Sequence, residues 1–406
     1  MSAVRGGRAA GVPPFREPAR SAHLRPPEDG DRNKTVPGPV QAVGLAQIGV
    51  QRGGAVVCFR SVNCFVTGAS GFVGANLVHE LVARGHRVRA LLRPGADVRG
   101  LAGAAHERVE GDITDKSDTL AELMRGCDWC FHVAASYALW LPDYEPMFRA
   151  NVLGTQKVIR GAMKAGCSRI VYTSTVGCIG LPKPTPGDRI IPTDEKAPVS
   201  EAQMSNPYKL SKWQAEVAAR ELVQQGAPVV IVNPSAPVGP RDVRPTPTGK
   251  VIVDHLNRAM PGYLDTGLNF VHVRDVAVGH ILAAEKGRLG ERYILGHRDG
   301  NWTMQHAFQE IERLSGVLGP RMRVPYSLAM AAAHVDEFVS KFTGKPPKAP
   351  LAGVRMAKHT MWFNPAKAVA ELGMPQTPPA EALADAIRWF RDNGYVRRLR
   401  PEAGRA

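Results

Sequence analysis

The sequence predicts an α/β protein, with a doubly wound parallel sheet followed by a smaller C-terminal substrate lobe. Short apolar runs alternate with longer helical patterns from residue 61 to about residue 240, and this alternation is typical of parallel strands joined by helical crossovers. A glycine triplet stands at the first junction of strand and helix, in Gly68-Ala69-Ser70-Gly71-Phe72-Val73-Gly74. After residue 240 the alternation weakens, which indicates a second lobe.

Each expected strand follows from a local pattern. Strands are expected at residues 62–67, 86–92, 107–111, 129–135, 170–174 and 229–232. Most of these segments are short apolar runs bounded by glycine or polar residues, which is the pattern of buried strands. Residues 107–111 are more polar and are expected to form a short third strand. Residues 240–270 and 300–380 show no clear period and are expected to be mixed insertions.

The expected helices are marked by their spacing and by their ends. Leu77 and Leu81 lie four residues apart in a helical pattern that follows the glycine triplet and stops at Gly85. Residues 146–166 form a further helix, and residues 380–394 form a closing amphipathic one. Asn206-Pro207 predicts another helix start, because an N-cap residue is followed by proline.

Composition and charge divide the chain further. It has 406 residues, 44% of them hydrophobic, and a net charge of +15. Residues 1–60 hold eight Arg, one Lys and four acidic residues, and residues 397–406 hold four Arg and one Glu. Both ends read as basic tails, the first of them disordered. Residues 61–240 are expected to form an NAD(P)-binding domain, and residues 241–396 to form mainly the lobe, with returns to the sheet.

Several classes of protein are excluded. The chain has no apolar run of the roughly 18 residues that a transmembrane helix requires. It has no basic stripe interleaved with aromatic residues, so a nucleic-acid partner is not expected. The six cysteines are too few to stabilise so long a chain by disulfides, which favours a reducing compartment such as the cytoplasm. Cys127 and Cys130 are interpreted as buried thiols, and no histidine spacing indicates a metal site.

The glycine triplet predicts a phosphate-binding turn. Glycines there permit a tight turn, the approach of the backbone to a pyrophosphate, and close packing of helix on strand. The N-terminus of the helix supplies unpaired N–H groups and the positive end of the helix dipole. The residues expected to bind the cofactor here are Gly68, Gly71, Phe72, Val73 and Gly74.

The ends of the second and third strands bear on the choice between NAD and NADP. An acid often follows the second strand where NAD is preferred, but this chain has Arg93. A guanidinium there can pair with a 2′-phosphate, which favours NADP, and the alternative is a solvated arginine at a strand end. Asp112 follows the third strand, where it would lie near the nucleotide base or else cap the next helix.

Tyr208 and Lys212 are the candidate catalytic pair. They stand four residues apart on one helix, so they share a face. An ammonium beside a phenol lowers the pKa of the phenol and makes it a usable proton shuttle. Ser174 and Thr175, at a strand end, are candidates for a hydroxyl that binds the substrate oxygen, and the alternative is that they satisfy loop backbone.

Together these segments resemble the extended short-chain dehydrogenase/reductase superfamily, the NAD-dependent epimerase/dehydratase family, over roughly residues 63–395. The resemblance rests on the glycine triplet, His132-Val133-Ala134-Ala135, Asn151-Val152-Leu153-Gly154-Thr155 and Tyr208-Lys209-Leu210-Ser211-Lys212. Residues 233–242, 245–249 and 265–270 are most similar to hopanoid-associated sugar epimerases, and dihydroflavonol reductase-like enzymes are the next neighbours.

The resemblance implies a role for particular residues. Tyr208 would be the general acid/base, Lys212 its activator and Thr175, rather than Ser174, the catalytic hydroxyl. Besides the glycine loop, the residues implied to hold NAD or NADP are Arg93, Asp112, Ile113, Val133, Ala134, Ala135, Tyr208, Lys212, Pro234 and Ser235. Arg93 departs from the acid that is typical of epimerases that retain NAD.

The resemblance implies an NAD(P)-dependent oxidoreductase acting on a secondary alcohol or ketone. The first expectation is a hopanoid-associated sugar epimerase, and the alternative is an NADPH-dependent carbonyl reductase similar to dihydroflavonol 4-reductase. A non-catalytic dinucleotide-binding scaffold is the alternative of another class. The substrate would be a sugar nucleotide, a sugar-bearing lipid or another carbonyl compound. The residues expected to line its binding site are Tyr137, Trp140, Arg241 and Tyr263. A homodimer, a cytoplasmic location and, for a lipid substrate, association with the inner membrane surface are expected.

Overall fold

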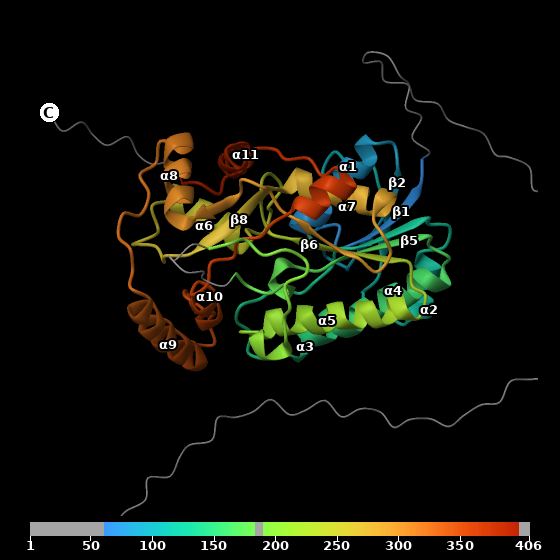
Figure 1. The fold of residues 1–406 in the computed structure, drawn as a ribbon, viewed down its shortest axis with the longest axis horizontal. Helices are drawn as coiled ribbons and strands as arrows, with labels where there is room; N and C mark the ends of the chain where they lie inside the picture. The colour runs from blue at the N-terminus through green and yellow to red at the C-terminus, as the bar shows by residue number, and fades with distance from the viewer. Residues whose placement is uncertain (1–60, 183–189, 398–406) are drawn as a thin grey trace, which may run out of the picture. The chain divides into compact units, whose positions relative to one another are not determined.

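A seven-stranded sheet forms the central layer of the protein (Figure 1). The computed structural model describes residues 61–182 and 190–397. The strands are β1 (Asn63–Thr67), β2 (Arg87–Leu92), β3 (Glu107–Glu110), β4 (Trp129–His132), β5 (Arg169–Thr173), β6 (Val229–Pro234) and β9 (Arg292–Leu295). They pair in parallel in the order β3-β2-β1-β4-β5-β6-β9. The chain therefore starts in the middle and winds outward in both directions, and the expected doubly wound class is confirmed.

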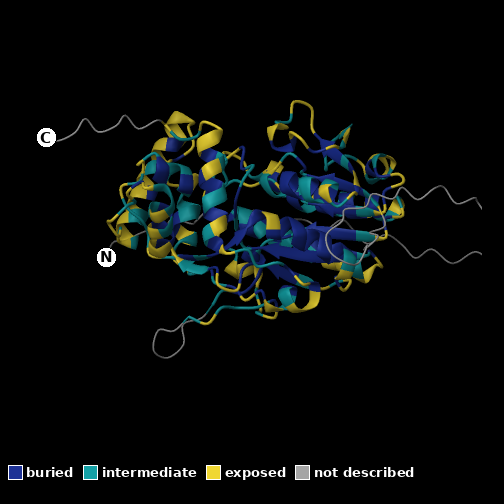
Figure 2. Cartoon of the chain, turned by 90° about the horizontal axis from the view of Figure 1, so that it is seen from above, coloured by how far each residue is buried: buried dark blue, intermediate teal, exposed yellow. Residues whose placement is uncertain are grey.

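Helices cover both faces of this sheet. On one face lie α1 (Phe72–Ala83) and α7 (Val273–Lys286), and on the other lie α2 (Ser117–Leu123), α4 (Gly154–Lys164) and α5 (Pro207–Gln224) (Figure 1). Successive side chains of a strand point to opposite faces, so Val66 packs under α1 and α7 whereas Phe65 packs under α2, α4 and α5. The central strands are buried on both sides, as Figure 2 shows.

The expected strands and helices of the first domain are present, with shifted ends. β4 stops at His132 rather than at residue 135, so Val133, Ala134 and Ala135 belong to the loop at the carboxyl edge. The helix expected at 146–166 consists of α3 (Glu145–Phe148), a π-helical turn η2 (Arg149–Leu153) and α4. π-Helical turns occur often at functional sites.

The chain after β6 forms a second, small sheet that the pattern did not reveal, and this sheet with its helices is called the small lobe. Its strands are β7 (Ala236–Val238), β8 (Gly267–His272) and β10 (Asn301–Thr303), in the order β10-β8-β7. Helices α6 (Pro247–Leu256), α8 (Met304–Ser315) and α11 (Pro379–Asp392) share its hydrophobic core. Two further helices, α9 (Tyr326–Thr343) and α10 (Leu351–Met356), lie at the edge of the lobe (Figure 1).

Short helical turns complete the described chain. They are η1 (Arg99–Leu101), η3 (Val176–Cys178), η4 (Glu201–Gln203) and η5 (Ala368–Leu372). The tails expected at residues 1–60 and 397–406 lie outside the described residues, apart from Arg397. None of the described helices is both long and apolar enough to cross a membrane.

Candidate active site

The glycine loop lies between β1 and α1 at the carboxyl edge of the sheet. Gly68 has a φ of +70°, and a Cβ added to it would stand 2.6 Å from the backbone nitrogen of Ala134. A Cβ on Gly74 would overlap the carbonyl oxygen of Gly68. Both positions therefore require glycine, because α1 starts in direct contact with β1 and the loop after β4.

The first turn of α1 is available to an anion. Its N-cap is Gly71, no side chain caps it, and its first turn contains no acidic residue. Phe72 and Val73 begin the helix half-buried. The uncapped N–H groups and the glycine cradle suit the pyrophosphate of a dinucleotide, so the residues present fit this cofactor.

The structure brings Arg93 and Asp112 near one another. Arg93 is exposed directly after β2. Burial opposes ionisation of Asp112, but hydrogen bonds from Thr114 and the charges of Arg93 and Arg149 outweigh it and hold the pKa of Asp112 below its usual range. Asp112 Oδ1 accepts from the backbone N–H and the hydroxyl of Thr114, at 2.8 and 2.6 Å. Asp112 therefore shapes a local turn and does not cap α2, whose N-cap is a different residue.

The loop after β4 is fixed to α5 by Asn151. The side chain of Asn151 accepts from the N–H of Ser136 at 2.7 Å and donates to the carbonyl of Ser136 at 3.0 Å. It also donates to the hydroxyl of Ser211 at 2.9 Å. Val133 and Ala134 are half-buried and Ala135 is exposed beside the glycine loop. The π-helical turn that contains Asn151 thus holds the loop expected to line the cofactor.

Tyr208 begins α5 and meets a second tyrosine. Asn206 caps the helix through a 2.9 Å hydrogen bond from the N–H of Lys209, and Pro207 occupies the first turn, as expected. The rings of Tyr208 and Tyr137 meet edge to face with their centroids 4.3 Å apart. Burial raises the pKa of Tyr208 above its usual range. Tyr208 therefore holds its proton firmly in this structure.

Lys212 points to the sheet rather than to the phenol of Tyr208. Its Nζ donates to the carbonyl of Thr173 at 2.8 Å and to the hydroxyl of Tyr172 at 3.1 Å. Burial lowers the pKa of Lys212 to about 8. The expectation that Lys212 lowers the pKa of Tyr208 is thus not met here, because the two residues share a helix face while the ammonium is bound to β5.

The two candidate hydroxyls after β5 have different surroundings. Ser174 is buried, and its hydroxyl donates to a carboxylate oxygen of Glu216 at 2.5 Å. Thr175 is half-buried, and among the described residues its Oγ1 has one hydrogen bond, accepted from the N–H of Gly177 at 3.1 Å. Thr175 keeps a hydroxyl proton for a ligand, whereas the hydroxyl of Ser174 is already engaged.

A buried charge network behind Thr175 was missed by the sequence analysis. Glu216 accepts from Asn233 Nδ2 at 3.0 Å and pairs with Arg292 at 3.3 Å. Asn233 also donates to the carbonyl of Thr175 at 2.9 Å. Glu216 sits one helical turn after Lys212 on α5, but nothing in its sequence neighbourhood identifies a partner, since Asn233 and Arg292 come from β6 and β9.

The end of β6 closes the site. Pro234 is buried at the last position of the strand, and Ser235 follows it half-buried. The Ser235 hydroxyl donates to Asn269 Oδ1 at 2.9 Å, which ties β6 to β8 of the small lobe.

Ile113, which is expected to contact the cofactor, packs over Gly154 of α4. A Cβ added to Gly154 would lie 3.0 Å from Ile113 Cδ1.

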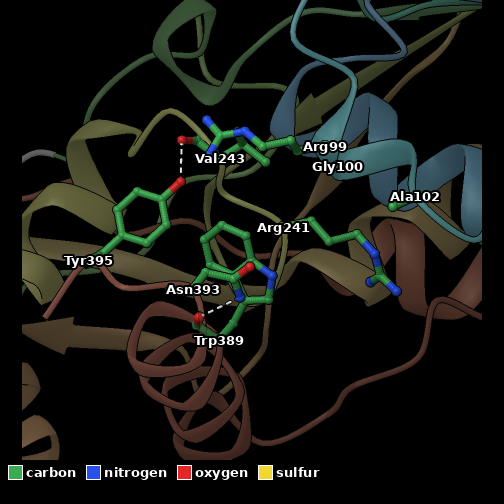
Figure 3. A pocket seen from close by; sticks show the side chains of 8 residues that line it. All are labelled: Arg99, Gly100, Ala102, Arg241, Val243, Trp389, Asn393 and Tyr395. Carbon is green, nitrogen blue, oxygen red and sulfur yellow. Dashed lines mark hydrogen bonds between the residues drawn. The ribbon is translucent and has the colours of Figure 1, made fainter.

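Two of the residues expected to meet the substrate lie elsewhere. Arg241 lines a pocket of about 230 Å³ with Arg99, Trp389 and Tyr395 (Figure 3), and none of the lining residues is a candidate catalytic residue. Arg241 also donates to Asn76 of α1 at 3.2 Å. Tyr263 packs against Phe308 in the core of the small lobe.

The cysteines are confirmed as buried thiols. Cys127 and Cys130 are free and buried, as are Cys64, Cys167 and Cys178, while Cys58 lies outside the described residues. Burial raises the pKa of the Cys127 thiol. Within the described part of the chain no cluster of His, Cys, Asp and Glu could hold a metal ion.

Comparison with known proteins identifies the family. The NAD dependent epimerase/dehydratase family matches residues 64–296. A dihydroflavonol 4-reductase-like protein of Synechocystis sp. is 44% identical over 337 residues, which cover 82% of this chain and 96% of that protein. Sterol demethylase protein B of Methylococcus capsulatus is 33% identical over 333 residues, covering 82% of this chain and 99% of that protein.

Two solved structures share this fold along most of the chain. The crystal structure of gox2253 is 43% identical, with a TM-score of 0.72 over 83% of this chain and 100% of that one. The nucleoside-diphosphate-sugar epimerase PA4631 of Pseudomonas aeruginosa is 26% identical, with a TM-score of 0.67 over 83% of this chain and 99% of that one. The chain therefore belongs to the NAD dependent epimerase/dehydratase family, and it is an NAD(P)-dependent enzyme rather than a non-catalytic scaffold.

Proposed function

We propose that this protein is an NADPH-dependent reductase that converts a ketone or aldehyde to an alcohol, with Tyr208 as the proton donor. The observation that carries the proposal is the position of a half-buried phenol at the start of α5, together with a Thr175 hydroxyl after β5 that donates to none of the described residues. Both residues follow or face the carboxyl ends of strands in a doubly wound sheet, where ligands of such folds bind.

Thr175 and Tyr208 have separate roles at the carbonyl oxygen of the substrate. When bound, the nicotinamide cofactor supplies a hydride to the carbonyl carbon. The Thr175 hydroxyl donates a hydrogen bond to the carbonyl oxygen, and Tyr208 donates a proton to that oxygen as negative charge develops on it. Burial raises the pKa of Tyr208, so the phenol is protonated but is a weak acid, and it gives its proton only as negative charge develops on the substrate oxygen.

Lys212 supports this chemistry from its place against β5. Its ammonium is held by the carbonyl of Thr173, two residues before Thr175. From this position the charge of Lys212 does not lower the pKa of Tyr208, so the support that we propose for Lys212 comes through the cofactor. Lys212 is the group that would bind the nicotinamide ribose, in which case it exchanges one of its present acceptors for a ribose hydroxyl.

The preference for NADPH rests on Arg93. It is exposed after β2 with its charge near Asp112, and a guanidinium suits a 2′-phosphate. Replacing Arg93 with Ala should raise the KM for NADPH about tenfold or more and leave the KM for NADH within about twofold, because a charge-assisted contact contributes about 1.5–3 kcal/mol. Arg87→Ala, an exposed arginine at the opposite end of β2, is the control. Equal changes for both cofactors would contradict this preference.

An epimerase is the second candidate function. The 26% identity to a nucleoside-diphosphate-sugar epimerase favours it, and so does the similarity of residues 233–242 to hopanoid-associated sugar epimerases. The two functions differ in their redox balance. A reductase consumes one NADPH per product, whereas an epimerase returns its cofactor to the starting state and retains it.

The decisive experiment measures cofactor consumption and a pair of tyrosine variants. The purified protein should oxidise NADPH in proportion to a ketone or aldehyde supplied from a panel. Tyr208→Phe should lower kcat at least 100-fold and leave the Kd for NADPH within about twofold. Tyr137→Phe removes the hydroxyl of the neighbouring ring and should leave kcat within about tenfold. Undiminished turnover by Tyr208→Phe would refute the assignment, and epimerised sugar without net NADPH loss would support the epimerase.

A further inference from the structure

Helix α9 presents its apolar face to solvent. Its exposed apolar residues repeat at helical spacing along its length, and they are Leu328, Ala331, Ala332, Val335, Phe338, Val339 and Phe342. Phe338 and Phe342 are 62% and 77% exposed, and their rings are in contact. An amphipathic helix of a soluble domain normally turns this stripe to the core. We call these seven residues the α9 face.

The orientation of α9 is fixed by its opposite side. Asp336 accepts a hydrogen bond from the N–H of Ala349 at 2.7 Å, and Glu337 accepts one from the N–H of Leu351 at 2.8 Å. Ala333 and Ser340 are buried on this side. The acidic residues of the helix therefore hold the segment that leads into α10, and turning the α9 face inward would break these bonds.

Unpaired lysines border the α9 face. Lys341, Lys345 and Lys348 are exposed at the C-terminal end of the helix and just beyond it, and none of them forms an ion pair with a residue that the structure describes. Residues 321–359 contain seven Lys and Arg and two acidic residues, the two that bind the segment before α10. Arg321 and Arg323 pair with Glu312 and Asp265, which leaves five other basic residues. The surroundings of the α9 face are thus positively charged.

We propose that the α9 face docks onto the surface of an anionic lipid bilayer. An apolar stripe enters the boundary between headgroups and acyl chains, and lysines beside it attract anionic headgroups. A second copy of the chain is a poorer occupant, because pairing two α9 faces across a twofold axis would bring two sets of lysines together. The proposal concerns a surface helix and does not depend on the identity of the reaction.

Docking through α9 would place the candidate active site near the bilayer. α9 packs beside α10 (Figure 1). In α10, an added Cβ at Gly353 would lie 3.3 Å from Leu139 of the loop after β4, and Met356 packs in one cluster with Val176, the neighbour of Thr175. A docked molecule would therefore hold the substrate side of the site close to the bilayer.

Vesicle flotation of the full chain tests the proposal. Wild-type protein should float with vesicles of equal parts phosphatidylcholine and phosphatidylglycerol in about 0.1 M salt, and much less with phosphatidylcholine alone or in about 0.5 M salt. The double variant Phe338→Glu/Phe342→Glu should lower the partition coefficient at least tenfold. Both side chains are exposed, so the variant should keep the circular dichroism spectrum and unfolding temperature of wild type. Leu289→Glu, at a residue 51% exposed in the turn before β9, is the matched control and should float like wild type.

Conservative and charge variants sharpen the result. Phe338→Leu/Phe342→Leu should retain flotation, and Lys341→Gln/Lys345→Gln/Lys348→Gln should lower it only for anionic vesicles. The proposal is overturned if wild type does not float, or if the Glu double variant floats as well as wild type, which would assign the binding to another part such as residues 1–60. It is also overturned if light scattering finds a dimer that the double variant dissociates while no vesicle binding is seen.

Discussion

The hydroxyls of Ser174 and Thr175, two neighbouring residues after β5, have different surroundings because the backbone directs them to opposite sides. Successive residues in extended backbone point to opposite sides. Ser174 therefore reaches the buried carboxylate of Glu216, and Thr175 stays at the edge of the site. The family resemblance favours Thr175 as the catalytic hydroxyl, and its surroundings in the structure support the same choice.

Substituting each hydroxyl in turn separates stability from catalysis. Ser174→Ala leaves a buried carboxylate with one hydrogen bond fewer, so the free energy of unfolding should fall by about 1.5–3 kcal/mol while kcat stays within about threefold. Thr175→Ala should lower kcat at least about tenfold, and Thr175→Ser should restore most of it. Urea denaturation and steady-state kinetics measure the two effects. If Ser174→Ala lost kcat as Thr175→Ala does, the purely structural role assigned to Ser174 would be wrong.

Buried histidines make stability depend on pH. His280 is bound by Thr173 Oγ1 at 2.9 Å and by the carbonyl of Val276 at 2.8 Å. Burial lowers the pKa of His280 to about 4, against the opposing effect of the Val276 carbonyl. Burial, with the charge of Lys212, likewise lowers the pKa of His132 to about 3. An unfolded histidine titrates near 6.5, so below that pH the unfolded chain binds more protons than the folded one.

The predicted acid dependence has a definite sign. The stabilisation from each depressed pKa is fully present above about pH 6.5 and is lost as the pH falls toward 4 or 3. Between pH 7 and pH 4.5, His280 alone should account for a loss of about 2 kcal/mol in the free energy of unfolding. His280→Asn should show a shallower fall over that range than wild type, whereas the exposed His334→Asn should not. A wild-type stability that rose on acidification through this range would contradict the prediction.

At the scale of elements, two glycines with the same backbone conformation have different neighbours. Gly68 and Gly95 have φ values of +70° and +69°, which disfavour any other residue. An added Cβ meets the backbone of Ala134 at Gly68 but meets nothing within 4 Å at Gly95. Only the first glycine sits at the junction of β1, α1 and the loop after β4.

Alanine at these two glycines should therefore differ in cost. Gly95→Ala should lose about 1–2 kcal/mol of stability, the cost of a left-handed conformation alone, and keep cofactor affinity. Gly68→Ala should lose more, because backbone must shift, and should weaken NADPH binding at least about tenfold. Thermal unfolding and fluorescence titration with NADPH measure both. Similar results for the two variants would argue against a cofactor-binding role for the β1–α1 loop.

At the centre of the sheet, the strands that the sequence revealed are those buried along nearly their whole length, whereas the edge strand β3, also predicted, is mostly exposed. β1, β5 and β6 are buried on both faces, so each stands out as an apolar run. The short strand β7 contains a proline and gives no such signal. α9 falls within residues 300–380, where no clear period was expected, and its apolar stripe marks the exposed side rather than the core side. The direction of the Lys212 side chain could not be predicted either, because spacing fixes a helix face but not which neighbour an ammonium selects.

At the scale of the whole molecule, the site is assembled by sheet order rather than by sequence order. β1, β4, β5 and β6 are adjacent in the sheet, so their carboxyl ends bring Gly68, Ala134, Thr175 and Pro234 to one edge. Ser235 then links this edge to β8 through Asn269. A dinucleotide bound across these ends contacts segments far apart in the sequence, and its binding energy adds to the stability of the entire fold.

A thermal shift measured across variants separates cofactor binding from catalysis. NADPH at about 100 times its Kd should stabilise the folded state by about 2.7 kcal/mol, which raises the Tm of a unit of this size by about 4 °C. At the same NADPH concentration, Tyr208→Phe should show the same rise, because the phenol acts on the substrate oxygen, and Gly68→Ala should show about half of it or less. If NADPH did not raise the Tm of Tyr208→Phe, the phenol would be needed for cofactor binding. The loss of turnover in that variant would then not report on proton transfer. If NADH stabilised the wild-type protein more than NADPH does, the preference for NADPH that Arg93 indicates would be wrong. The fold and the catalytic proposal would not be affected.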